Sequence, residues 1–206
     1  MVIFPPWKIS RPWLPSVDEK SHLVRHQVAP LYCQPHLLPR PDFLRRNRQY
    51  HGHPRPIASD GGTTKERKMA GLMRGHPRQK RKTLLYNARL TSVARARAQD
   101  MARRNYFGHV DPDGHGPNWH LTRAGYRLPI EWTAFKSSNQ VESILGGKAT
   151  AKEAFHTLVN SSGHRSHLLA TAPFYSNHLR YGVGYAYDPA STYHHYWVVI
   201  TAPIQK

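Results

Sequence analysis

The pattern of this 206-residue chain changes abruptly near Leu84, and that change limits the folds open to it. Residues 1–82 hold 11 of the 17 prolines, and 17 Lys and Arg against 5 Asp and Glu. Proline lacks a backbone donor and interrupts helices and strands, so a segment this rich in proline and positive charge buries little apolar surface. Beyond Leu84, apolar residues recur at helical spacing. We therefore predict a largely disordered basic region over 1–82 and a folded domain over 83–206.

Apolar spacing and capping residues predict three helices in the folded part. Apolar residues over 90–101 share one helical face, and Asn87 is placed to cap the first turn of that helix. A short helix is expected over 118–124. The third helix begins at Thr150, because Thr150 and Glu153 have the spacing of a reciprocal capping box.

Two strands are predicted near the C-terminus. Residues 181–187 alternate tyrosine and valine with glycine and alanine, and residues 193–201 are rich in aromatic and β-branched side chains. Residues 188–192 would join these strands as an antiparallel hairpin. Helices that precede a terminal hairpin indicate an α+β fold or an α/β/α layered domain.

The formal net charge of +18 suggests an anionic partner, since clustered Lys and Arg release counterions from nucleic acids. The densest basic run, over 78–82, is short and is typical of a solvated surface. No RNP motif, zinc finger or helix-turn-helix pattern accompanies it. Nucleic-acid binding is therefore the third of three candidate functions, and it is supported by charge alone.

Cys33 is the only cysteine, so no disulfide within the chain can stabilise the fold. No stretch reaches the roughly 18 consecutive apolar residues of a membrane helix. The apolar start over 1–7 is too short and too rich in proline to be the core of a signal peptide. We expect a monomer without a membrane span, stabilised by packing.

Three polar residues are predicted at the ends of elements, where side chains can form a site: His109, Glu142 and His164. Two neutral imidazoles with a carboxylate nearby could bind zinc and leave an open coordination position. A carboxylate beside a histidine could instead perform acid–base chemistry. Each side chain could equally satisfy backbone groups of its own loop. The spacing alone leaves all three interpretations open.

Four blocks of sequence follow one another in a recognisable order. They lie over 87–109, which ends in an F-x-H motif, 160–169, 181–184 and 196–197. Together they resemble the bacterial CAP (SCP-like, PR-1-like) family over about residues 84–202. The resemblance implies a three-layer sandwich, an extracellular or cell-surface setting, and a groove that holds two histidines and a glutamate. By motif match these are His109, His164 and Glu142, and in some relatives zinc or lipid is bound.

The chain departs from this family pattern in two places that matter for the site and the fold. Ser143 replaces the asparagine that usually follows the glutamate, which removes an amide that could orient Glu142. The family's first helix has no clear counterpart, because two glycines and Pro77 disfavour a continuous helix over 69–82. We hypothesise that a misassigned start or a frame error replaced the signal peptide and the first helix.

These observations predict a binding module rather than an enzyme. Its ligand would be a divalent metal such as zinc, a small apolar molecule or a cell-surface component, held by His109, Glu142 and His164. A metal-dependent or acid–base hydrolase is the alternative, although no Ser or Cys lies in a recognisable nucleophile motif. Zinc is the one cofactor that the sequence suggests, and the sequence does not identify any other.

Overall fold

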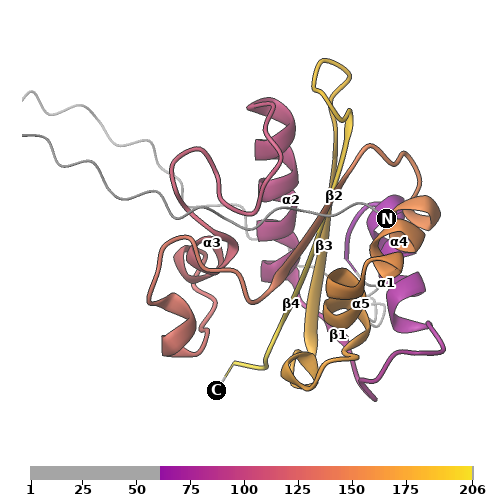
Figure 1. Cartoon of the computed structure of the whole chain (residues 1–206), viewed down its shortest axis with the longest axis vertical. Helices are drawn as coiled ribbons and strands as arrows, with labels where there is room; N and C mark the ends of the chain where they lie inside the picture. Colours follow the sequence, from indigo (N-terminus) through magenta and orange to yellow (C-terminus); the bar gives the residue numbers. More distant parts are fainter. Residues whose placement is uncertain (1–60, 206) are drawn as a thin grey trace, which may run out of the picture. The chain divides into compact units, whose positions relative to one another are not determined.

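The computed structural model describes residues 61–205, so Cys33 and most of the predicted basic region lie outside the described residues (Figure 1). The helices are α1 (Thr64–Arg74), α2 (Ala88–Arg103), α3 (Pro117–Arg123), α4 (Ala151–Asn160), α5 (Ser162–Leu169) and the short 3-10 turns η1 (Ile130–Thr133) and η2 (Pro173–Tyr175). The strands are β1 (Leu85–Tyr86), β2 (Glu142–Gly146), β3 (Arg180–Tyr187) and β4 (His195–Ala202). Within this part of the chain, no helix is both long and apolar enough to cross a membrane.

Three layers make up the domain, as the sequence predicted. The sheet has the order β1-β3-β4-β2, with α2 on one face and α1, α4 and α5 on the other (Figure 1). Strands β3 and β4 form the predicted antiparallel hairpin, and β2 adds to β4 in antiparallel register. The two-residue β1 pairs with β3 in parallel, so the sheet is mixed at one edge.

The predicted helix starts are confirmed by their caps. The Asn87 side chain accepts a hydrogen bond from the backbone N–H of Leu90, three residues into α2. Thr150 and Glu153 form the reciprocal capping box of α4. Gly125 follows α3 with a φ of +78°, a left-handed conformation that glycine adopts without strain.

Two glycines of β3 allow α2 to lie directly on the sheet. A Cβ added to Gly182 would lie 2.2 Å from the backbone nitrogen of Thr91, and one added to Gly184 would lie 2.2 Å from the carbonyl carbon of Ala94. No side chain fits in that space. The alternation of small and large residues along β3 therefore gives one face to the α2 backbone and the other to the core under α1 and α4.

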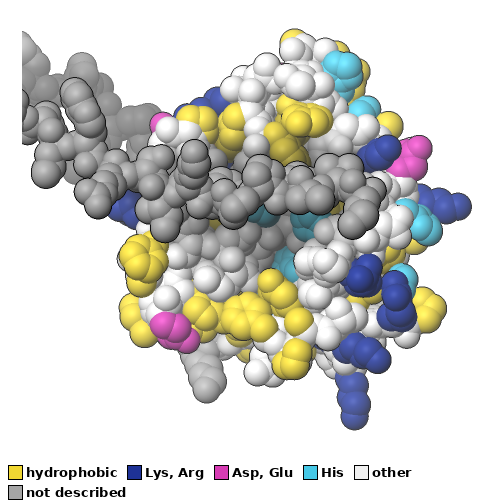
Figure 2. All heavy atoms as spheres, viewed as in Figure 1, with side chains coloured by type: hydrophobic (Ala, Val, Ile, Leu, Met, Phe, Trp, Pro, Cys, Tyr) yellow, Lys and Arg dark blue, Asp and Glu magenta, His cyan; other side chains and the backbone are white. Residues whose placement is uncertain are grey.

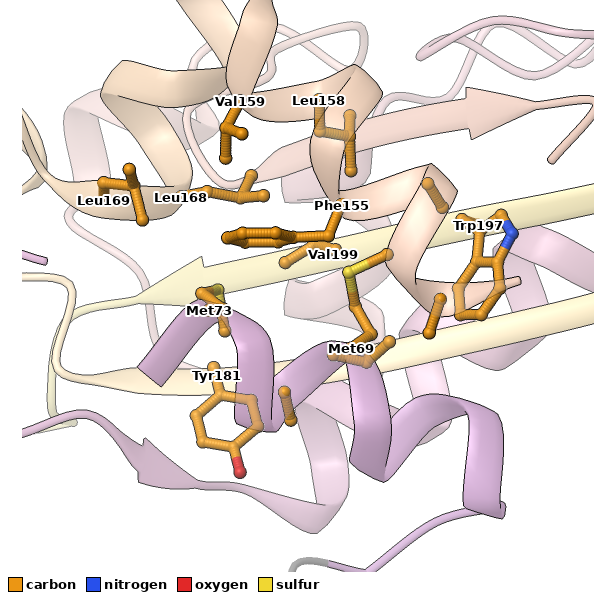
Figure 3. Close-up of a cluster of buried hydrophobic side chains, with 14 of the residues drawn as sticks. Met69, Met73, Phe155, Leu158, Val159, Leu168, Leu169, Tyr181, Trp197 and Val199 are labelled. Carbon is orange, nitrogen blue, oxygen red and sulfur yellow. The ribbon is translucent and has the colours of Figure 1, made fainter. Parts of the chain in front are cut away.

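The apolar core is divided by the sheet into two clusters. On one side, α1, α4 and α5 pack on β3 and β4 through side chains that include Met69, Met73, Phe155, Leu168, Tyr181 and Trp197 (Figure 3). On the other side, α2, α3 and the segment after α3 join the sheet in a second cluster, whose side chains include Leu90, Met101, Leu121, Tyr126, Val198 and Ile200. The first cluster needs α1 to cover it.

The helix α1 corrects the sequence analysis. It begins at Thr64, where the Thr63 and Glu66 side chains form a capping box, and it ends at Arg74, before Pro77. Its residues Met69 and Met73 are fully enclosed. The window over 69–82 lies too late in the chain to reveal this helix, so the boundary at residue 83 and the hypothesis of a missing first helix are wrong. The capping pattern just upstream is the signal in the sequence that marks the start of α1.

Replacing Met73 with alanine should lower the free energy of unfolding by about 2–5 kcal/mol, because a fully buried methionine leaves a cavity that the core cannot refill. Chemical denaturation of the full chain measures this. Lys68→Ala on the exposed face of the same helix is the control and should leave the free energy of unfolding within about 0.5 kcal/mol of the original. Equal midpoints for both variants would mean that α1 is not part of the cooperative core.

A second feature of the core is a chain of buried polar side chains between the sheet and α5. Hydrogen bonds join Ser143 Oγ to His167 Nδ1 (2.7 Å), His167 Nε2 to Thr201 Oγ1 (2.8 Å), and His178 Nδ1 to the Thr201 carbonyl (3.0 Å). Burial, together with the positive charge of Arg81, lowers the pKa of His178 to about 4. Burial also lowers the pKa of His167, so both histidines are held neutral in the folded chain.

Stability should decrease as the pH falls from about 6.5 to 4, because the unfolded chain takes up a proton on His178 over that range and the folded chain does not. Protonation of His178 in the unfolded chain lowers the free energy of unfolding by about 3 kcal/mol, and this loss is complete when the pH has fallen to the pKa of His178 in the folded chain. Denaturation midpoints measured across pH for the unmodified chain and for His178→Phe test this. The denaturation midpoint of His178→Phe should fall less steeply with decreasing pH than that of the unmodified chain. The exposed control His156→Gln should lose stability with pH as the unmodified chain does. Equal slopes for all three would contradict the assignment.

Candidate functional site

A buried ion pair between α2 and β2 forms the centre of the site. Arg97 and Glu142 are both buried, and Arg97 Nε lies 3.5 Å from Glu142 Oε2. The other carboxylate oxygen, Oε1, accepts from His109 Nδ1 at 2.9 Å. The His109 side chain is 38% exposed, so the pair links the interior of the domain to its surface. We call Arg97, His109, Glu142 and the adjacent His164 the His109 site.

Arg97 also holds the loop that carries His109. Its Nη1 donates to the hydroxyl of Tyr106 at 2.7 Å, and its Nη2 donates to the carbonyls of Gly108 (3.1 Å) and His109 (2.9 Å). A planar guanidinium with several fixed donors can bind a loop and a carboxylate at once. The position of the imidazole is therefore set from inside the protein.

Glu142 is placed by its own backbone contacts. Asn139 Oδ1 accepts from the Glu142 N–H at 2.9 Å, and Asn139 Nδ2 donates to the Glu142 carbonyl at 3.2 Å. Ser143, which follows in β2, is hydrogen-bonded to His167 in the buried chain of polar side chains. The asparagine that Ser143 replaces is thus not needed to orient the carboxylate, because Arg97 and His109 contact both of its oxygens.

His164 follows α4, as expected, and lies in the first turn of α5. Burial lowers the pKa of His164 and the charge of His109 lowers it further, so the two imidazoles are close enough to influence each other. Arg165 donates to the carbonyl of Val159 at 2.9 Å, which ties α5 to the end of α4. The structure thus brings His109 and Glu142 into contact, and His164 is near enough to be affected by the charge of His109.

The residues of this site do not fit a zinc site with three protein ligands. Within residues 61–205, no three His, Cys, Asp or Glu side chains converge in a way that could hold a metal ion. One oxygen of Glu142 already faces the guanidinium of Arg97 and the other bonds His109. A positive guanidinium beside the carboxylate also opposes a second cation there. Zinc would have to rely on the imidazoles of His109 and His164.

A second imidazole–carboxylate pair lies near the first and was not predicted. His120 Nε2 bonds Asp111 Oδ2 at 2.9 Å. Burial and the charge of Arg97 lower the pKa of His120, against the opposing effects of Asp111 and Glu142. Arg97 therefore acts on both carboxylate–imidazole pairs, through contact with Glu142 and through its charge on His120. In the sequence, Arg97 falls on the apolar face of α2, four residues after Val93. A charged residue at such a position indicates a buried ion pair.

Comparisons with known proteins agree with this architecture. A family model described as the cysteine-rich secretory protein family (CAP) matches residues 64–201, which includes α1. Uncharacterized protein YkwD of Bacillus subtilis (strain 168) is 32% identical over 123 residues, covering 60% of this chain and 39% of that protein. The chain therefore spans well under two thirds of the length of this relative.

Solved structures were compared as well. An extracellular protein containing an SCP domain from Bacillus anthracis str. Ames shares the fold, with a TM-score of 0.53 and 20% identity over 68% of this chain and 40% of that one. An outer surface protein from Borrelia burgdorferi is less similar, with a TM-score of 0.49 and 14% identity, over 66% of this chain and 90% of that one. Because the family match covers most of the chain and the three-layer fold accompanies it, this chain belongs to the CAP, or cysteine-rich secretory protein, family as a bacterial-type member.

Proposed function

We propose that this chain is an extracellular or cell-surface CAP domain that binds a small amphipathic ligand at the His109 site. The observation that carries the proposal is the bond between Glu142 and His109. A carboxylate can only accept, so His109 Nδ1 carries the hydrogen and its Nε2 is left as an acceptor for a ligand. His164, whose pKa is lowered, adds a second neutral imidazole.

Apolar side chains next to the imidazoles support an amphipathic ligand. Phe107 and Val110 lie close to His109 in the chain, and the Phe107 ring lies 4.9 Å from that of Tyr193. Phe107 and Tyr193 are 41% and 40% exposed, and aromatic residues exposed together often mark a binding surface. Histidine and hydrophobic side chains lie side by side on the face shown in Figure 2. A ligand with an apolar body and one hydroxyl group could pack its body on the apolar side chains and donate its hydroxyl hydrogen to an imidazole.

Acid–base catalysis is the second candidate, and the same bond favours it. An imidazole oriented by a buried carboxylate is the arrangement of a general base. A hydrolase would then activate water or a hydroxyl of the substrate, because no nucleophile motif is present. Because Glu142 is engaged by Arg97 as well as by His109, binding is the stronger proposal.

The setting outside the cell is supported by family membership and by a similar protein. The B. anthracis structure that shares the fold is described as an extracellular protein. A cell-surface component as partner and a monomeric state belong to the same proposal. Fractionation of the native cells, followed by detection of the chain in the medium or at the surface, tests the location.

Octanol, with one hydroxyl group and an apolar chain, is a suitable probe of the site. We expect saturable binding by calorimetry, weakened about tenfold in His109→Phe, which removes the acceptor, and in Glu142→Gln, whose amide can also donate and so no longer fixes the hydrogen on His109 Nδ1. His156→Phe makes the same replacement on the exposed face of α4 and should bind octanol as the unmodified chain does. No saturable binding, or equal binding by all variants, would overturn the proposal.

Zinc binding through His109 and His164 stays a prediction that a zinc titration tests. The double variant His109→Ala, His164→Ala should lose the zinc bound at neutral pH and remain folded by circular dichroism. Affinity in the unmodified chain should fall as the pH drops through ~6.5, because protons compete for the ring nitrogens. Equal uptake by the double variant would place the zinc on other histidines.

A further inference from the structure

A separate cavity of about 740 Å³ opens between α2, α3 and the loop over 111–115. Asp111 is buried in its wall and is held by two backbone amides, those of Asp113 and His115, each at 2.9 Å from Oδ1. A carboxylate fixed in this way is a rigid support for the side chain that it contacts. The cavity therefore has one wall with little freedom to adjust.

His120 presents an acceptor to this cavity. Its Nε2 bonds Asp111 Oδ2, and a carboxylate can only accept, so the hydrogen is on Nε2 and the neutral ring has its lone pair on Nδ1. Within residues 61–205, no hydrogen-bond partner of Nδ1 is found. His120 is a quarter exposed and lines the cavity, so a ligand can reach it.

Trp119 provides an aromatic surface beside His120. The His115 ring stacks on the Trp119 ring with centroids 3.8 Å apart and an angle of 16° between the planes. The His120 ring stands almost perpendicular to that of Trp119, at 5.1 Å and 88°. The stacked pair fixes the indole plane, and Trp119 is only half-buried, so part of the indole surface is available to a planar ligand.

Arg123 differs from the other guanidinium groups of the wall. Arg97 is paired with Glu142, Arg103 with Asp100 and Arg104 with Asp113, the last at 2.6 Å. Arg123 has no carboxylate partner among residues 61–205, and its Cζ lies 5.7 Å from the centre of the Trp119 ring. An unpaired guanidinium on the wall of a cavity is suited to a carboxylate or phosphate of a ligand.

We propose that this cavity binds a small aromatic carboxylate that also carries a hydroxyl group. The carboxylate pairs with Arg123, the ring packs on Trp119, and the hydroxyl donates to His120 Nδ1. The Arg123 Cζ and the His120 ring centroid lie 5.7 Å and 5.1 Å from the Trp119 ring, and all three residues line the same cavity. This cavity shares Arg97 with the His109 site, but the three ligand contacts are made by other residues and do not rest on the function proposed there.

The probe is 4-hydroxybenzoate, titrated into the full chain by calorimetry, with 4-methoxybenzoate as the matched ligand. The methoxy group cannot donate to His120, so we expect it to bind about tenfold more weakly than the hydroxyl compound. This comparison uses the unmodified protein, so it does not depend on whether a variant folds. Equal affinities for the two ligands would overturn the assignment of His120 as acceptor.

Variants then assign the other two contacts. Arg123→Gln should weaken both ligands by about tenfold, because the charge-assisted bond to the carboxylate is lost. Lys152→Gln removes the same charge from α4, on the opposite face of the sheet, and should leave both affinities unchanged. Trp119→Ala should weaken both ligands as well. Absence of saturable 4-hydroxybenzoate binding, or binding that Arg123→Gln and Lys152→Gln affect equally, would overturn the proposal.

Discussion

The arrangement of the site depends on one buried guanidinium. Arg97 enters the domain on the face of α2 that packs on the sheet, where it meets Glu142 and binds the carbonyls of the loop that carries His109. Burial of two charges is costly unless they are paired and hydrogen-bonded. Because the pair is satisfied largely by the loop and by His109, the geometry of the surface imidazole and the stability of the interior are linked.

Arg97 can make these contacts because α2 lies so close to the sheet. Gly182 and Gly184 leave no side chain between β3 and the α2 backbone, which brings the helix within reach of β2. The same guanidinium affects the pKa of His120, so two imidazoles with carboxylate partners are organised around one cation. The His109–Glu142 pair reaches the surface, and the Asp111–His120 pair lines the cavity beside α2 and α3. We propose a small ligand for each pair, and the two proposed ligands differ in charge.

Local signals in the sequence predicted much of this fold. The caps at Asn87 and Thr150 and the β3–β4 hairpin depend on neighbouring residues, which a sequence displays directly. The contact between His109 and Glu142 followed from resemblance to a family, since spacing could not show it. Arg97 and the Asp111–His120 pair were missed, because their partners are brought together only by packing of α2 and α3. The late domain boundary came from weighing prolines and glycines above the capping box that precedes α1.

A double-mutant cycle on Arg97 and Glu142 tests most directly whether they act as one unit. Arg97→Met and Glu142→Gln should each lower the free energy of unfolding by about 3–5 kcal/mol, because each leaves its buried partner unpaired. The double variant should lose little more than either single variant, which corresponds to a coupling of about 2 kcal/mol or more. Losses that add to within about 0.5 kcal/mol would show that the two residues are independent and that Arg97 does not organise the site.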